Sequence, residues 1–173
     1  MKKLKIFAII LLLTIASCKK KQDPEPDLPP ETQSGANTFG CYLNGVPWKP
    51  SPKEFGNNTL YIQLDGPYFV LYAKCNEGVR DEVMSFFSDK VTSIREGNYP
   101  LKKSATFDNR CTFWDYKKNI EMFSMDRDIV EDGLLTITKF DLNKRFVSGR
   151  FWFSLQKDNI RYEAKEGRFD ISF

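Results

Sequence analysis

The stretch Gly149-Arg150-Phe151-Trp152-Phe153-Ser154-Leu155 decides the fold, and it returns at the end of the chain as Gly167-Arg168-Phe169-Asp170-Ile171-Ser172-Phe173. Both copies read Gly-Arg-Phe-x-apolar-Ser-apolar, with an apolar side chain at every second position. Because successive side chains of a strand point to opposite faces, this period predicts a strand with one buried face. We therefore predict strands over 145–156 and 160–173, each burying its phenylalanine face.

Similar short runs of β-branched and aromatic residues, separated by turn residues, extend back to Thr38. With no amphipathic helix beyond a single turn over 75–81, about ten strands predict an all-β fold: one antiparallel β-sandwich or a partly open barrel. Gly97–Leu101 interrupts the pattern and is predicted to be a crossing loop. The other predicted strands are Thr38–Leu43, Val46–Trp48, Asn58–Leu64, Tyr68–Cys75, Glu82–Ser88, Val91–Ile94, Arg110–Tyr116, Ile120–Met125 and Gly133–Phe140.

Turn residues predict which neighbouring strands pair. Asn44-Gly45 lies between two of the runs and suits a type I′ hairpin, whose two central residues have positive φ. Pro47 lacks an amide hydrogen, so the second arm of this hairpin should be short or lie at a sheet edge. Asp65-Gly66-Pro67 and Lys117-Lys118-Asn119 predict two further hairpins.

The N-terminal residues have the layout of a lipoprotein signal. Lys2, Lys3 and Lys5 precede an apolar run, and Leu12–Cys18 resembles a lipobox. We expect cleavage after residue 17 and a lipid on Cys18. A transmembrane anchor is the alternative, but it needs about 20 apolar residues and this run is shorter.

Residues 18–35 are predicted to be a tether, because Lys19–Ser34 is rich in proline and charge and poor in large apolar side chains. The β domain would then span 36–173. Lys19 directly after the lipid-bearing cysteine implies sorting to the outer membrane. The sequence does not predict whether the domain faces the periplasm or the cell surface.

Composition argues against several classes of function. Removing Lys2, Lys3 and Lys5 from 26 basic residues leaves 23, which balance 23 acidic ones, so we expect no nucleic-acid partner. Histidine, the commonest general base and metal ligand, is absent. Since no nucleophile or phosphate-loop motif occurs either, we expect no enzyme, no cofactor and no metal.

Four acidic residues before Gly133 are the densest acidic cluster. Their spacing does not fit a calcium loop, which needs alternate acids and a glycine at the sixth position. We therefore interpret them as a solvated loop between strands: Asp126, Asp128, Glu131 and Asp132.

Cysteine usage allows one disulfide in an oxidising compartment. With Cys18 assigned to lipid, Cys41, Cys75 and Cys111 remain. Cys41 and Cys111 both lie in strand-like runs, so we predict that they pair and that Cys75 stays a thiol.

Aromatic residues could form a platform that stacks on sugar rings, the alternative being burial in the core. By alternation, Trp152 faces away from Phe151 and Phe153, and Trp114 away from Phe113. This makes Trp114 and Trp152 the candidate ligand-binding residues. The full candidate set also includes Trp48, Tyr61, Tyr68, Tyr72, Tyr99 and Tyr116.

Several of these segments together resemble a family of Bacteroidetes-type outer-membrane lipoproteins of unknown function. The resemblance rests on the lipid cysteine and tether, Leu28–Cys41 with the following Asn44-Gly45 and Trp48, and the closing segments Leu135–Asp141, Ser148–Phe151 and Glu166–Asp170. It implies a secreted, lipid-anchored all-β domain, and it supplies no catalytic residues.

These observations predict a lipid-anchored cell-envelope protein. Its partners would be the membrane, through the anchor, and a glycan or other small ligand bound by the exposed tryptophans. The alternative is a protein-interaction or structural envelope component without a small-molecule ligand.

Overall fold

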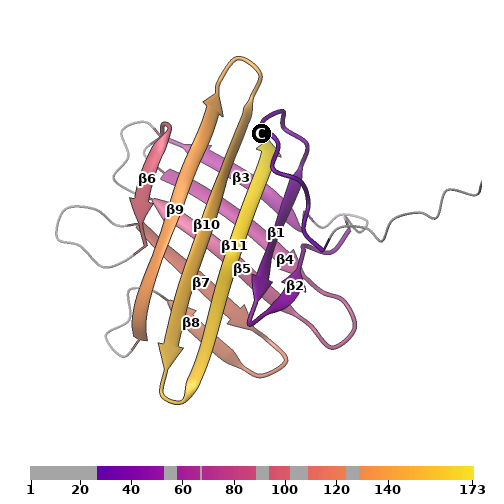
Figure 1. Ribbon diagram of the computed structural model, residues 1–173, viewed down its shortest axis with the longest axis vertical. Helices are drawn as coiled ribbons and strands as arrows, with labels where there is room; N and C mark the ends of the chain where they lie inside the picture. The colour runs from indigo at the N-terminus through magenta and orange to yellow at the C-terminus, as the bar shows by residue number, and fades with distance from the viewer. Residues whose placement is uncertain (1–26, 53–57, 67, 89–93, 102–108, 124–128) are drawn as a thin grey trace, which may run out of the picture.

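The computed structural model describes residues 27–52, 58–66, 68–88, 94–101, 109–123 and 129–173. Within these ranges the chain forms two antiparallel sheets that lie face to face, with the six-stranded sheet in front in Figure 1. The strand orders are β2-β1-β11-β10-β9-β6 and β3-β4-β5-β7-β8. This is the all-β antiparallel sandwich that the sequence predicts, and it is not closed into a barrel.

The strands of the six-stranded sheet are β1 (Thr38–Leu43), β2 (Val46–Trp48), β6 (Gly97–Pro100), β9 (Ile129–Asp141), β10 (Phe146–Lys157) and β11 (Ile160–Ser172). Those of the five-stranded sheet are β3 (Leu60–Asp65), β4 (Tyr68–Cys75), β5 (Glu82–Ser88), β7 (Asn109–Asp115) and β8 (Ile120–Phe123). None of these described segments is a helix that could cross a membrane.

The sequence echo forms the centre of the six-stranded sheet. In the antiparallel pair β10–β11, Gly149 lies opposite Phe169, Arg150 opposite Arg168, and Phe151 opposite Gly167. A Cβ atom added to Gly167 would lie 2.5 Å from the ring of Phe151, and one on Gly149 would lie 2.6 Å from the ring of Phe169. Each copy therefore supplies the glycine that makes room for the phenylalanine of the other.

The core lies between the two sheets and is built from the alternating faces that the sequence predicts. Phe151, Phe153 and Leu155 of β10 are buried, as are Phe169 and Ile171 of β11. The ring of Phe86 in β5 lies 4.8 Å from that of Phe151 and 6.2 Å from that of Phe153, so these side chains join the two sheets.

The predicted hairpins form. Asn44 and Gly45 both have positive φ, 49° and 78°, as a type I′ turn requires. β2, which contains Pro47, is the edge strand next to β1, and β3 pairs with β4 and β7 with β8. Turn chemistry thus predicted these neighbours correctly.

Three predictions about the middle of the chain were wrong. Gly97–Pro100 is not a crossing loop but strand β6, paired with β9 at the sheet edge, where a terminal proline is tolerated. β9 begins at Ile129, so Glu131 and Asp132 lie in a strand opposite Leu155 and Ser154 rather than in a loop. Cys75 ends β4, and residues 76–81 contain a bend and a turn but no helix. Of the predicted strand Val91–Ile94, only Ile94 lies within the described residues.

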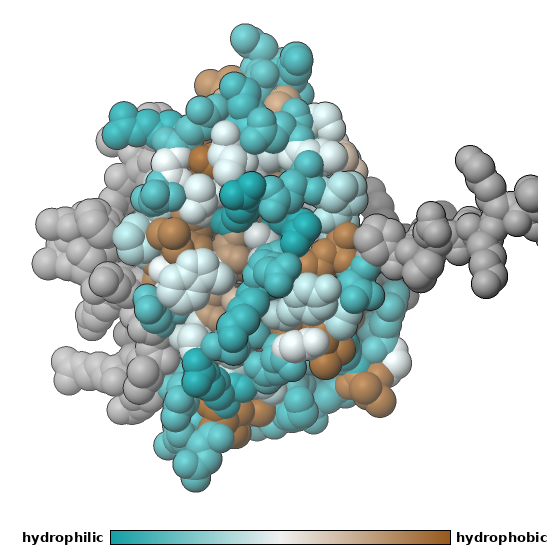
Figure 2. Space-filling view, in the orientation of Figure 1, coloured by the Kyte–Doolittle hydropathy of each residue, from teal (hydrophilic) through white to brown (hydrophobic). Residues whose placement is uncertain are grey.

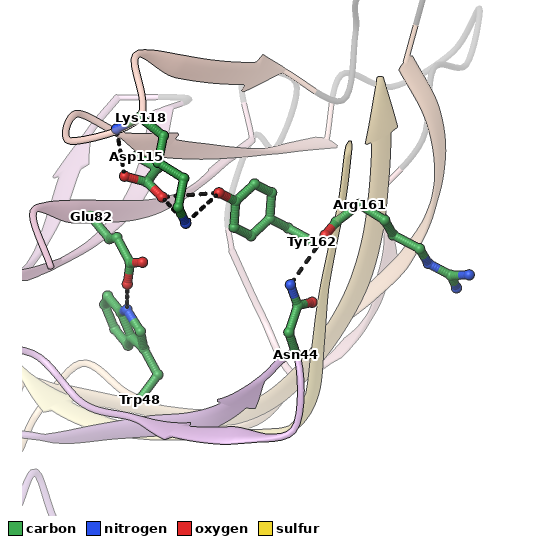
Figure 3. A network of polar contacts seen from close by, with 7 residues as sticks. All are labelled: Asn44, Trp48, Glu82, Asp115, Lys118, Arg161 and Tyr162. Atoms are coloured by element: carbon green, nitrogen blue, oxygen red, sulfur yellow. Dashed lines mark hydrogen bonds and ion pairs between the residues drawn. The ribbon is translucent and has the colours of Figure 1, made fainter. Parts of the chain in front are cut away.

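Two buried carboxylates connect the sheets at one end of the sandwich (Figure 3). Glu82 accepts a hydrogen bond from Nε1 of Trp48 at 2.7 Å, and Asp115 accepts one from the hydroxyl of Tyr162 at 2.9 Å. Lys118 Nζ donates to the same Asp115 oxygen at 2.8 Å. Burial opposes ionisation of Asp115, but the hydrogen bonds from Lys118 and Tyr162 outweigh it, so the pKa of Asp115 lies below its ordinary value.

The predicted disulfide is absent. Cys41 lies in β1 and Cys111 in β7, on different sheets, and both are buried thiols, as is Cys75. The sulfur of Cys41 instead lies 4.0 Å from the sulfur of Met84 in β5. Burial raises the pKa of the Cys41 thiol to about 12, so this side chain acts as a small apolar core residue.

Candidate functional site

Residues 27–36, which we call the strap, lie against the outer face of the six-stranded sheet. Leu28 is buried, and Pro29 packs so closely on Gly40 that a Cβ there would lie 2.7 Å from the proline ring. Gln33 donates a hydrogen bond to Thr138 of β9 at 3.3 Å. The strap, which precedes the predicted start of the domain at residue 36, therefore packs against the sheet.

Asp170 fixes the strap to β11. Its side chain points to the outer face, since Phe169 and Ile171 on either side face the core, yet it is only 1% exposed because the strap covers it. It accepts hydrogen bonds from the backbone N–H groups of Ser34 (2.9 Å), Gly35 (2.8 Å) and Ala36 (3.1 Å). The hydroxyls of Thr32 and Ser148 donate to it as well, at 2.6 and 2.7 Å.

This cluster of donors keeps Asp170 ionised. Burial raises the pKa of a carboxyl, but the hydrogen bonds from Thr32, Ser148 and the strap backbone outweigh that effect and hold the pKa of Asp170 well below its ordinary value. The strap is thus held by an anion seated among backbone amides rather than by apolar packing alone.

The two candidate tryptophans lie on opposite outer faces of the sandwich. Trp152 of β10 is 41% exposed on the six-stranded sheet, while Trp114 of β7 is half-buried on the five-stranded sheet. Alternation correctly predicted that both face away from the core. They cannot form one platform, however, because the sandwich separates them.

Trp152 lies beside a groove of about 300 Å³ between the strap and the sheet. Glu31 of the strap forms one wall, and Arg150 and Arg168 lie in the floor, with Leu134 and Thr136 of β9 and Glu166 of β11 around them. Glu31 Oε2 accepts hydrogen bonds from Nε of Arg150 at 2.9 Å and from its Nη2 at 2.5 Å. Nη2 of Arg168 lies 3.6 Å from Oε2 of Glu166.

The groove thus places one exposed indole ring beside two guanidinium and two carboxylate groups. Paired charged side chains present planar sets of donors and acceptors, which match adjacent hydroxyls on a sugar ring, and an indole face supplies apolar contact. Figure 2, which looks onto this face, shows a largely hydrophilic surface interrupted by pale and brown patches. Such a surface suits a polar ligand with one apolar side.

The outer face of the five-stranded sheet is aromatic but differently arranged. The rings of Tyr61 and Tyr72 stack on each other at 4.8 Å, and those of Trp114 and Tyr116 meet edge to face at 5.4 Å. Lys74 Nζ lies 5.7 Å from the ring centre of Tyr116. Because these rings contact one another, less of each face is available to a ligand than at Trp152.

The remaining candidate residues are elsewhere or outside the described ranges. Trp48 is fully buried and bound to Glu82, so it was wrongly included in the platform. The hydroxyl of Tyr99 is engaged by the backbone of Arg95, to which it donates at 2.8 Å. Cys18, Asp126 and Asp128 lie outside the described residues. Across the described ranges, no three acidic, cysteine or histidine side chains gather as they would around a metal.

Two wider grooves, of about 550 and 770 Å³, lie near Lys49 and Pro50. Both include Pro52, where the described chain stops until residue 58, so the described residues do not define their walls.

The buried acids Glu82 and Asp115 lie opposite each other in register, but each already accepts a hydrogen bond from an aromatic side chain of the other sheet.

Sequence reasoning missed Glu31, Arg150 and Arg168 as site residues. The signal for the arginines was present, because each precedes the phenylalanine of the echo and must therefore face outward when that phenylalanine is buried. Glu31 had no such signal, since a proline-rich segment gives no periodicity from which a contact could be predicted.

Comparison with known proteins yields no relative: no family model, no curated protein and no solved structure matches the chain.

Proposed function

We propose that this protein is a lipid-anchored cell-envelope protein that binds glycans through the groove beside Trp152. The observation that carries the proposal is the exposed indole of Trp152 beside Arg150, Arg168, Glu31 and Glu166 in one groove. A volume of about 300 Å³ is at the lower end for small-ligand sites and suits one or two sugar rings.

The binding test is a glycan array probed with the full-length protein, followed by titration of any hit. Trp152→Ala should weaken binding about five- to thirtyfold, since loss of one ring contact and its buried area is worth about 1–2 kcal/mol. Trp114→Ala is the matched control, as it removes the same ring from the opposite face and should leave the affinity unchanged. Absence of any array hit, or equal loss in both variants, would refute the proposal.

The anchor rests on the lipobox and is tested separately. Cys18→Ser should abolish incorporation of a labelled palmitate analogue and leave the signal segment uncleaved. If the variant incorporates as much label as the wild type, lipidation at Cys18 is excluded. The outer membrane is proposed from Lys19, so density-gradient separation of the two membranes decides that assignment.

A second candidate function, protein interaction within the envelope, is favoured by the five-stranded face. Tyr68 and Tyr116 are 56% and 49% exposed there, and aromatic residues are enriched at protein interfaces. A photo-crosslinking residue at position 116 should capture a specific partner in membranes, whereas the same residue at position 152 should not. Capture at neither position counts against this function.

A further inference from the structure

Two arginines lie directly opposite each other in the floor of the groove. The antiparallel echo makes Arg150 and Arg168 register partners on the outer face, where like charges directly opposite each other repel. Glu31 of the strap pairs with Arg150, and Glu166, which lies beside the bulge of β11, pairs with Arg168. Nearby carboxylates therefore relieve the repulsion between these two guanidinium groups.

Glu31 occupies this position as an internal carboxylate. Nε and Nη2 of Arg150 both donate to one oxygen of Glu31, Oε2, and the same two donors could instead bind the two oxygens of a ligand carboxylate. The pair is exposed, with 63% of the Arg150 side chain and 45% of the Glu31 side chain accessible to solvent. An ion pair this exposed contributes little to stability, so a competing carboxylate can displace Glu31 at small cost.

The strap does not have to leave the sheet for this exchange. Asp170 holds the backbone of Ser34, Gly35 and Ala36 just after Glu31, so a rotation of the Glu31 side chain suffices. Glu31 also lies where the groove beside Trp152 meets a second groove, of about 140 Å³, next to Thr138. Both grooves share Glu31, Arg150 and Arg168, so the Glu31 side chain lies at their common boundary.

We propose that the ligand is an acidic glycan, whose uronic-acid carboxylate replaces Glu31 on Arg150 while its ring stacks on Trp152. This inference rests on the proposed glycan-binding function and names its substrate class. Arg150 and Trp152 are two residues apart on one strand face, hence about 7 Å, a spacing that one sugar ring with its carboxylate spans. Glu31 then acts as a competitor that weakens binding of any sugar needing Arg150.

The test compares an acidic sugar with its neutral form on the full-length protein. Tetragalacturonate and a hyaluronan tetrasaccharide are titrated by calorimetry, each beside its methyl ester, which keeps the ring and linkage but removes the charge. We expect at least tenfold tighter binding of one acid than of its ester, weakening as salt is raised. Glu31→Gln should tighten binding of the acid about fivefold and leave the ester unchanged, and Arg150→Gln should reduce the acid to the affinity of the ester.

Arg161→Gln is the matched control, because Arg161 lies on the same outer face and also forms an exposed pair, with Glu163 at 2.9 Å. It should change neither affinity. If neutral sugars or esters bind as tightly as the acids, and Trp152→Ala weakens that binding, the ligand is not specifically acidic. The proposal of glycan binding then stands, and only the inference of an acidic ligand is refuted. If Glu31→Gln weakens binding of the acid, Glu31 is a ligand contact rather than a competitor and the inference fails. If no sugar binds, both proposals fall.

Discussion

Asp170→Asn should destabilise the protein strongly, because it removes the buried carboxylate that holds the strap. Asp170 accepts hydrogen bonds from three backbone amides and three hydroxyls under the strap. An asparagine keeps one acceptor oxygen and turns an NH₂ group towards the remaining donors, so at least two of these bonds are lost. At about 1.5–3 kcal/mol for a hydrogen bond to a charged group, and with partial relaxation of the strap, we expect a loss of about 3 kcal/mol.

Urea unfolding followed by tryptophan fluorescence measures this loss, and thermal unfolding should show a fall in Tm of about 10 °C. Asp141→Asn is the matched control, since Asp141 accepts bonds from the backbone N–H groups of Asn143 and Lys144 at 3.0 and 2.9 Å in an exposed turn. It should cost less than about 1 kcal/mol. Limited proteolysis should also cleave within the strap faster in Asp170→Asn than in the control.

The same residue predicts the dependence of stability on pH. Because the folded pKa of Asp170 is depressed, its stabilisation is present in full above the unfolded value of about 3.9 and is lost as pH falls towards the folded value. The wild type should therefore lose stability below about pH 4, whereas Asp170→Asn should lack this part of the profile. Wild-type-like stability of Asp170→Asn at pH 7, or an unchanged acid profile, would refute the role assigned to Asp170.

Further predictions concern the core. Gly149→Ala should lower the free energy of unfolding by several kcal/mol and reduce the yield of folded protein, because its Cβ would press on the Phe169 ring and on the Thr136 carbonyl. Gly78→Ala, at an exposed turn, is the control and should cost far less stability. Tyr162→Phe should cost about 1–2 kcal/mol in urea unfolding, since the buried Asp115 loses a donor, and an unchanged midpoint would show that the bond contributes nothing. A thiol reagent should not modify Cys41, Cys75 and Cys111 in the native protein, but it should modify all three in denaturant without reductant. If two of the three thiols fail to react in denaturant, the protein contains the predicted disulfide after all.

Sequence reasoning succeeded where local chemistry determines the result. Asn44-Gly45 fixes a turn by its own backbone preferences, and alternation in β10 fixes which side chains are buried. It failed at β6, where Gly97 and Pro100 both count against a strand, although an edge position next to β9 tolerates them.

The site itself could be predicted only in part. Alternation showed that Trp152 and Trp114 face outward, but it cannot show which sheet a strand joins, so their separation on opposite faces was not foreseen. The strap was missed because it buries one large side chain, Leu28, and is otherwise held by amide groups around Asp170. Backbone donors are present in every sequence, so composition gives no indication of where they will be used.

The strap has one consequence for the order in which the molecule is made. Glu31 and Arg150 are 119 residues apart in the chain, and Thr32 and Asp170 are 138 apart. A nascent chain therefore carries the strap from the start but cannot seat it until β11 has been synthesised and has paired with β1 and β10. The groove is completed only when both ends of the domain meet, so a ligand that binds there distinguishes finished molecules from incomplete ones.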